Sequence, residues 1–293
     1  MATASNPVRE TTLRPGTSAD APACGRICFE AFRAIAEHHR FALDFASIEE
    51  ATGVVSLLLG HPGIYGVVAE REGRVIGSNF LDERSLIAGV GPITVDPEVQ
   101  NAGVGRQLML AVLERAGQGR FPGVRLLQAA YHTRSLSLYT KLGFNVREPV
   151  VALTGPPLRL AVPGHTVRVA TEADLDAANR LCLRVHGHDR SGDLLDAIRQ
   201  GVARVVERAG RITGYTSSIA FFGHTVGETN EDVQALIGAA PAFGGPGFLL
   251  PARNGEMYRW SLDHGLRVVY VLTLMTVGLY NEPAGAYLPS IFY

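Results

Sequence analysis

The chain has 293 residues, of which 46% are hydrophobic and 19% charged, and its formal net charge is −1 at pH 7. This length suits two domains of ordinary size, and the near-zero charge excludes the broad basic surface that binds nucleic acid or an anionic membrane. The first ten residues lack the apolar core of a signal peptide. The apolar run at 268–280 is too short and too β-branched to span a bilayer. We therefore expect a soluble, cytoplasmic protein.

The cysteines and histidines do not predict a metal site. Cys24, Cys28 and Cys182 include no C-x-x-C pair and do not complete a zinc site, so reduced, buried thiols are expected. The histidines at 38–39 and 186–188 have no third ligand spaced with them. We expect the protein to work without a metal.

The first predicted elements, a strand and a helix at 12–29, return at 166–183. The two segments align without gaps, and 8 of their 18 positions are identical. Each places a threonine, Thr17 or Thr171, before acidic residues, which predicts a capped helix start after a short strand. The chain therefore contains an internal repeat.

The next informative stretch is a strand, a glycine turn and a helix. Residues 86–95, LIAGVGPITV, predict a β-branched strand closed by Asp96-Pro97. Gly103 and Gly105 follow, and then leucines at helical spacing. Such a turn aims several backbone N–H groups at one point, backed by the positive end of a helix dipole. It is typical of a phosphate site.

The spacing of the glycines decides between kinds of phosphate loop. A Walker loop would need a lysine and a hydroxyl residue after Gly105, and a dinucleotide fingerprint would need a third glycine where Leu108 stands. What remains is Gln100-x-x-Gly103-x-Gly105-Arg106. This pattern resembles the acyl-CoA pyrophosphate loop of the GNAT acetyltransferases, Q/R-x-x-G-x-G/A.

A second motif lies at 126–146. It predicts a short strand from Leu126 to Ala130, a helix ended by Gly143, and the start of another strand. The GNAT segment reads N-x-x-A-x-x-L-Y-x-K-x-G-F. The chain keeps its leucine, tyrosine, lysine, glycine and phenylalanine and departs from it at His132 and Ser135. Two motifs in the right order make chance agreement improbable.

This resemblance implies an α/β (α+β) fold with two tandem GNAT domains. Each would have a mixed, mostly antiparallel sheet with flanking helices and a splayed central pair of parallel strands, which in the first copy end near Val95 and Ala130. The strand before the glycine turn would pair with the pantetheine arm of acetyl-CoA, and the turn would hold its pyrophosphate. The cofactor-binding residues implied are Ile93, Thr94, Val95, Gln100, Asn101, Ala102, Gly103, Val104, Gly105, Arg106, His132 and Ser135.

The resemblance also implies the chemistry. In the family the motif tyrosine, here Tyr139, is the acid that protonates the leaving thiolate, and a backbone N–H near Val95 polarises the thioester carbonyl. For the base we favour Glu83 or Asp82 at the end of the strand at 74–83. Asp96 and, through water, His132 remain alternatives.

The second copy is predicted to lack the cofactor site. We place the first domain at 1–153, a Pro- and Gly-rich linker at 154–165 and the degenerate domain at 166–293. After Thr225-Val226 the chain reads GETNEDVQALIGAA, with no glycine loop and three carboxylates at the helix start. Those carboxylates would satisfy the helix N-terminus themselves and repel a pyrophosphate. One acyl-CoA per chain is the expectation, and the apolar tail GAYLPSIFY predicts a last buried strand.

The predicted function is transfer of an acetyl group from acetyl-CoA to a primary amine of a small molecule or peptide, by direct attack in a ternary complex. Two alternatives stay open: a non-catalytic acyl-CoA sensor, and an acyltransferase that uses another acyl-CoA or a hydroxyl acceptor. The expected partner is the amine substrate, with neither nucleic acid nor membrane, and the chain would be a monomer or homodimer.

Overall fold

The first half of the chain is a sheet flanked by four helices, in a computed structural model that describes residues 10–292. The N-terminal segment considered above as a signal peptide lies almost wholly outside the described residues, as does Tyr293. The elements of this half are β1 (Thr12–Pro15), α1 (Ala21–His39), α2 (Ile48–Gly60), β2 (Ile64–Arg71), β3 (Arg74–Asp82), β4 (Ile87–Val90), β5 (Thr94–Val95), α3 (Val104–Gln118), β6 (Gly123–Ala129), α4 (Thr133–Lys141) and β7 (Asn145–Thr154).

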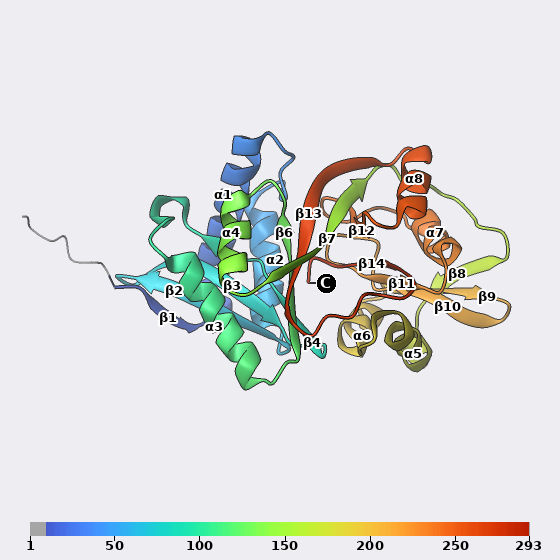
Figure 1. The fold of residues 1–293 in the computed structure, drawn as a ribbon, viewed down its shortest axis with the longest axis horizontal. Helices are drawn as coiled ribbons and strands as arrows, with labels where there is room; N and C mark the ends of the chain where they lie inside the picture. Colours follow the sequence, from blue (N-terminus) through green and yellow to red (C-terminus); the bar gives the residue numbers. More distant parts are fainter. Residues whose placement is uncertain (1–9, 293) are drawn as a thin grey trace, which may run out of the picture.

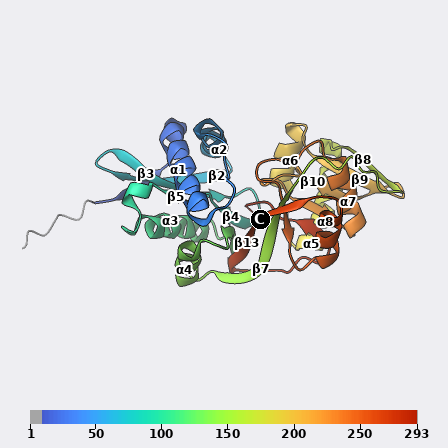
Figure 2. The same ribbon diagram turned by 90° about the horizontal axis from the view of Figure 1, so that it is seen from above.

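The second half repeats this order in shorter form. Its elements are β8 (His165–Val169), α5 (Leu175–His186), α6 (Ser191–Arg199), β9 (Arg204–Arg208), β10 (Arg211–Thr216), β11 (Thr225–Gly227), α7 (Asn230–Ala239), β12 (Phe248–Pro251), α8 (Gly255–Asp263), β13 (Arg267–Gly278) and β14 (Ala286–Leu288). Figure 1 and Figure 2 show the halves as two lobes lying side by side, with β7 and β13 between them. Across residues 10–292, no helix has both the length and the apolar composition that crossing a membrane requires.

The internal repeat is confirmed by matching contacts at the two helix starts. Arg14 donates to both carboxylate oxygens of Asp20 at 2.8 and 2.7 Å, and Arg168 does the same to Asp174 at 2.8 and 2.7 Å. In each copy the threonine and aspartate form a reciprocal capping box. The guanidinium of Arg14 holds the pKa of Asp20 well below its usual range. A strand and a helix are thus clamped together in the same way twice.

The two halves share a nine-stranded sheet, and the second half also has a five-stranded sheet of order β14-β11-β10-β9-β8. The nine-stranded sheet joins the halves. Its strand order is β1-β2-β3-β4-β6-β13-β7-β12, with β5 paired to β3. Strand β13 of the second half lies between β6 and β7 of the first, and β7 lies between β13 and β12. The segment between β7 and β8 contains no helix or strand. The domain ranges 1–153 and 166–293 stay a prediction, since β7 of the first half pairs with β12 and β13 of the second, and β13 pairs with β6 and β7 of the first.

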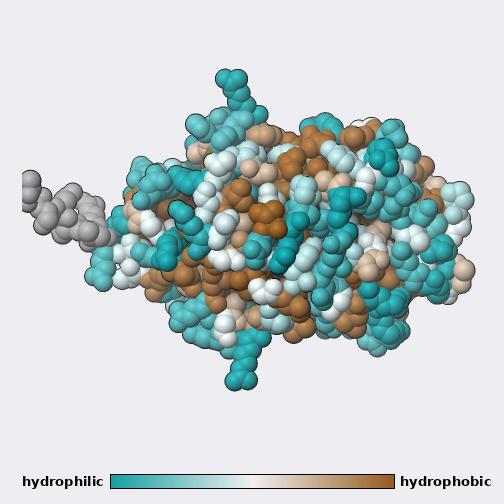
Figure 3. Space-filling model, viewed as in Figure 1, coloured by the Kyte–Doolittle hydropathy of each residue, from teal (hydrophilic) through white to brown (hydrophobic). Residues whose placement is uncertain are grey.

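The exchanged strand β13 contributes to the cores of both halves. Leu272 and Leu274 pack with α5 and α6, whereas Met275, on the opposite face, packs with α3 and α4. All three side chains are buried. On the face shown in Figure 3, hydrophobic residues gather mainly near the middle of the molecule, and hydrophilic residues spread over both lobes.

The strand predicted at 86–95 is interrupted. It forms β4 and β5, separated by a cis Gly91-Pro92 bond. Over Ile87–Gly89 strand β4 pairs in parallel with β6, but β5 pairs only with β3. The prediction of one continuous strand is therefore wrong, whereas the splayed parallel pair is confirmed: β4 and β6 separate beyond Gly89.

Because β13 joins both cores, we expect the protein to unfold as one unit. Leu274→Ala should lower the free energy of unfolding by about 2–5 kcal/mol, the usual cost of a cavity at a fully buried leucine. Val271→Ala, at a residue of the same strand that is 38% exposed, should cost about 1 kcal/mol or less. The measurement is denaturant unfolding followed by Trp260 fluorescence and by hydrogen exchange of β3 amides. Separate transitions for the two probes would contradict shared cooperativity.

Candidate active site

The glycine turn leaves the N-terminus of α3 open. Gly103 precedes the helix at φ +80°, a left-handed conformation that favours glycine. At Gly105 a Cβ would meet no atom closer than 3.8 Å, so space remains above the backbone. The first turn of α3 carries neither an acidic residue nor a side-chain cap, so its first N–H groups lack an intrahelical partner. They are free to bind an anion.

Hydrogen bonds of Arg134, which the sequence did not predict, connect this turn to α4. Arg134 donates to Gln100 Oε1 at 2.5 Å and to Asn101 Oδ1 at 3.0 Å, while Gln100 Nε2 donates to the carbonyl of Val95 at 3.2 Å. The sequence does contain one signal for this contact. Arg134 is a cation in the first turn of α4, where the helix dipole disfavours positive charge. Arg106, an exposed residue in the first turn of α3, is a second arginine in this part of the chain.

The corresponding place in the second half is already filled. Asp232 accepts from the backbone N–H of Thr229 at 2.9 Å, and the threonine side chain accepts from Asp232 N, so the N-terminus of α7 is capped by its own residues. Glu228, just before it, is paired with Arg211 at 2.7 Å. Asp232 therefore caps the helix as predicted, whereas Glu228 binds arginine and not the helix N-terminus.

The predicted last strand, β14, lies between β11 and β12 of the second half. It pairs antiparallel with β11, with Val226 opposite Tyr287, and lies against β12. Strands β11 and β12 correspond to β4 and β6, which are splayed open in the first half. The chain therefore occupies in the second half the position that is open in the first.

A cavity of about 350 Å³ lies where β4 and β6 separate. Val90, Gly91, Pro92 and Ile93 form one side and the residues from Leu126 to Ala129 the other. Four of the predicted site residues line it, namely Ile93, His132, Ser135 and Tyr139. The second half contributes further wall residues, namely Phe221, Phe222, Gly245, Pro246, Tyr270, Leu272 and Ile291. Both halves of the chain therefore form this cavity.

Tyr139 is held on α4 with its ring in the core. It is 7% exposed, packs near Phe144 with ring centroids 6.2 Å apart, and its hydroxyl makes no hydrogen bond with any described residue. Burial raises the pKa of Tyr139. The phenol therefore keeps its proton at neutral pH.

His132 and Ser135 form the start of α4. Ser135 Oγ donates to the carbonyl of His132 at 2.9 Å and accepts from Gln128 Nε2 at 3.0 Å. Burial, helped by the charge of Arg134, lowers the pKa of His132 to about 4. The imidazole is therefore neutral at pH 7.

The carboxylates favoured as the base do not line the cavity. Asp82 accepts from Arg84 at 2.9 and 2.6 Å, and Glu83 accepts from Arg115 at 2.7 and 2.9 Å. The alternative, Asp96, is buried and accepts from Arg74 at 2.6 Å. Each of these carboxylates is paired with an arginine, which argues against all three as the catalytic base.

Asp44 is the carboxylate that the sequence analysis missed. It lies between α1 and α2, lines the cavity, and accepts a hydrogen bond from the Tyr270 hydroxyl at 2.7 Å. Burial raises its pKa, an effect that the tyrosine hydroxyl partly opposes. Its one signal in the sequence is a single acid within the apolar stretch Phe41–Phe45.

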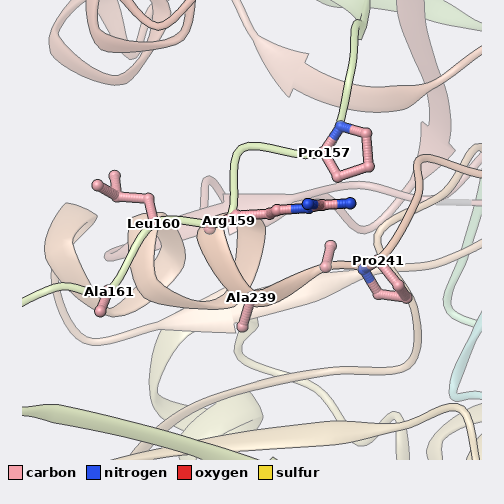
Figure 4. Close-up of a pocket in the computed structure, with 8 residues that line it drawn as sticks. Pro157, Arg159, Leu160, Ala161, Ala239 and Pro241 are labelled. Carbon is pink, nitrogen blue, oxygen red and sulfur yellow. The ribbon is translucent and has the colours of Figure 1, made fainter.

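Outside this cavity, the second half has an open hollow that is remote from the glycine turn. Figure 4 shows Arg159 lying between Pro157 and Pro241, at the end of α7. Arg159 is the one ionisable side chain among its lining residues, so the hollow holds no acid–base pair. Among residues 10–292, no three His, Cys, Asp or Glu side chains gather as a metal site.

Comparisons with known proteins agree with this geometry. Residues 62–146 match the family model described as the acetyltransferase (GNAT) domain. No curated protein sequence matches the chain. Among solved structures, a Pyrococcus horikoshii protein assigned to the acetyltransferases matches with a TM-score of 0.72 at 16% identity, covering 92% of this chain and 89% of that one.

Two further structures match over nearly the whole chain. A GCN5-related N-acetyltransferase from Sphaerobacter thermophilus has a TM-score of 0.63 at 18% identity and covers 93% of this chain and 96% of its own. A tandem GNAT protein from the clavulanic acid biosynthesis pathway has a TM-score of 0.55 at 14% identity, with coverages of 92% and 98%. At these identities the structures show a shared fold, and that fold is the predicted tandem arrangement.

The environment of His132 yields a direct test. We expect its imidazole to titrate near pH 4 by NMR, because burial disfavours the cation. Arg134→Gln should raise that pKa by removing a nearby positive charge, whereas Arg120→Gln, in the turn after α3, should leave it unchanged. A His132 pKa near 6.5 in the unaltered protein would show that the ring is solvated.

Proposed function

We propose that this protein, an acetyltransferase with a GNAT-family domain at residues 62–146, transfers an acetyl group from acetyl-CoA to a primary amine. The amine belongs to a small molecule or peptide and attacks directly in a ternary complex. The observation that carries the proposal is the open, uncapped N-terminus of α3 beside a cavity that contains Tyr139. The second domain has the same fold but no such opening.

The glycine turn suits a pyrophosphate. The free N–H groups of Val104, Gly105 and Arg106 would donate to phosphate oxygens, and the open space at Gly105 lets them approach the backbone. Arg106 and Arg134 would add positive charge on either side. The residues from Ile93 to Val95 would run along the pantetheine arm, and Ile93 already lines the cavity.

The reaction needs a neutral amine, a polarised carbonyl and a protonated leaving group. The amine nitrogen forms a bond to the thioester carbon as the carbon–sulfur bond breaks. The backbone N–H near Val95 would stabilise the developing oxyanion. Tyr139, whose pKa burial raises, would give its proton to the departing thiolate and recover one from solvent.

We propose Asp44, in place of Asp82 or Glu83, as the group that takes the ammonium proton. It lines the same cavity as Tyr139, and burial brings its pKa closer to that of a useful base. Asp82 and Glu83 remain as carboxylates that hold Arg84 and Arg115. All three cysteines are buried and free, which fits the proposed cytoplasmic location.

One acetyl-CoA should bind per chain, because the N-terminus of α7 is capped and β14 lies in the second strand gap. The measurement is calorimetric titration of acetyl-CoA. Gly103→Val should weaken binding about tenfold or more, since a β-branched residue is strained at φ +80°. Gly210→Val, at φ +74° in the β9–β10 turn, is the matched control and should leave affinity unchanged.

Two sites per chain would contradict the view that the second domain is closed to the cofactor. Equal loss of affinity in both variants would mean that destabilisation, and not the turn itself, explains the effect.

The roles of Tyr139 and Asp44 predict distinct kinetic changes. Tyr139→Phe should lower kcat by about 10²-fold, a usual loss for a missing proton donor, while Tyr258→Phe on α8 should leave kcat unchanged. For the unaltered protein, kcat/KM should rise with pH through an acidic limb above the ordinary aspartate value of about 3.9, because the base must be ionised. Asp44→Asn should remove that limb in stopped-time thiol assays. A limb that persists in Asp44→Asn would assign the base elsewhere.

A further inference from the structure

We propose that the acceptor is a small arylalkylamine, a primary amine on an aromatic body, whose ammonium group binds Asp44 and whose ring packs among aromatic side chains of both domains. This inference rests on the proposed function and narrows its substrate class. It concerns the part of the cavity away from the glycine turn.

The charges that line the cavity favour a cation. Asp44 and Glu50 are carboxylates, and none of the described lining residues is a lysine or arginine. His132 is neutral at pH 7 because burial lowers its pKa to about 4. Glu50 already accepts from the backbone N–H of Ala46 at 2.7 Å, capping α2. Glu50 is also exposed, whereas Asp44 is partly buried, so an ammonium group paired with Asp44 is screened less by water.

Asp44 also has one oxygen available. The Tyr270 hydroxyl donates to Oδ1, whereas Oδ2 makes no hydrogen bond with any described residue. Tyr270 belongs to the exchanged strand β13, so the second domain fixes the orientation of the carboxylate. An ammonium group at Oδ2 would complete this arrangement as a charge-assisted hydrogen bond.

The walls beside Asp44 are aromatic. Tyr131 stacks on Phe41 with centroids 4.2 Å apart and meets the edge of Tyr270 at 6.3 Å, and Tyr270 in turn meets Phe221 at 6.4 Å. Burial and the charge of Asp44 raise the pKa of Tyr131 to about 12, so its ring stays a neutral phenol. Such faces bind an apolar ring, and they also attract a cation beside it.

The size of the cavity sets an upper limit on the acceptor. Its volume of about 350 Å³ is at the lower end of the usual range for small-molecule sites. The loop that carries Phe221 is tied down, because the N–H of Ile291 donates to the Phe221 carbonyl at 2.8 Å. A small amine fits this space better than a folded protein or a long polyamine.

The first experiment measures thiol release from acetyl-CoA with four acceptors: 2-phenylethylamine, spermidine, an alanyl tripeptide and 2-phenylethanol. We expect kcat/KM for 2-phenylethylamine to exceed that of each other acceptor about tenfold or more, because it alone supplies both ring and ammonium. Faster turnover of spermidine or the peptide would overturn the substrate class and leave the proposed function intact. Turnover of none of the amines, with acetyl-CoA still bound, would overturn the proposed function itself.

The second experiment tests Asp44 by calorimetric binding of 2-phenylethylamine to the full chain. Asp44→Asn should weaken binding about tenfold or more, and Tyr270→Phe should weaken it less, since the ring remains. Asp44→Asn should stay folded, because burial already disfavours the charge it removes; a thermal melt checks this. Asp176→Asn, an exposed residue on α5, is the matched control and should bind normally. Unchanged affinity in a folded Asp44→Asn protein would refute the assignment.

Discussion

The pairing of β13 with both β6 and β7 is the constraint on which the rest of this molecule depends. Because a strand of the second domain completes the sheet of the first, neither half has a finished core without the other. The exchange also brings Tyr270 to Asp44, 226 positions earlier in the chain, and to the rim of the cavity. The same strand therefore completes the fold and forms part of the site.

The corresponding helices of the two copies, α3 and α7, differ in how their N-termini are capped. In α3 the cap is a glycine and the first turn has no acid, whereas in α7 a threonine and an aspartate satisfy the N–H groups that a phosphate would need. In the second half, strand β14 of the same chain also pairs along β11. A helix N-terminus is therefore either a binding site or a capped end, and a few residues decide which.

The local features of the site could be predicted from the sequence, because they depend on neighbours within a few residues. Gly103 requires a backbone conformation that glycine favours, and the threonine–aspartate repeat specifies two helix starts. The open N-terminus of α3 and the closed one of α7 follow from such signals. The tandem fold followed from the family resemblance that the same motifs carry.

The features that could not be predicted are set by tertiary contacts. The break at Gly91-Pro92 is an exception, because a glycine followed by a proline within the apolar stretch at 86–95 is itself a local signal against a continuous strand. Asp82 and Glu83 stand at a strand end where a base is plausible, but Asp82 binds its sequence neighbour Arg84, and Glu83 binds Arg115, which the fold brings in from α3. Asp44 sits in a loop without periodicity, and its environment comes from elements far along the chain. Burial and partner choice, which decide the pKa of a carboxylate, are properties of the folded state.

These contacts also show how the second domain contributes to the cavity of the first. Arg84 links Asp82 of the first half to Asp196 of α6, at 2.6 and 2.9 Å, and His61 lies 3.1 Å from the same Asp196 carboxylate. The ion pairs and the exchanged strand hold the second domain in one position against the cavity. Phe221 and Tyr270 are therefore fixed walls, and a wall that does not move discriminates between acceptors more sharply than a flexible loop. With β14 paired along β11, the second domain leaves no such opening of its own and contributes walls to the cavity of the first.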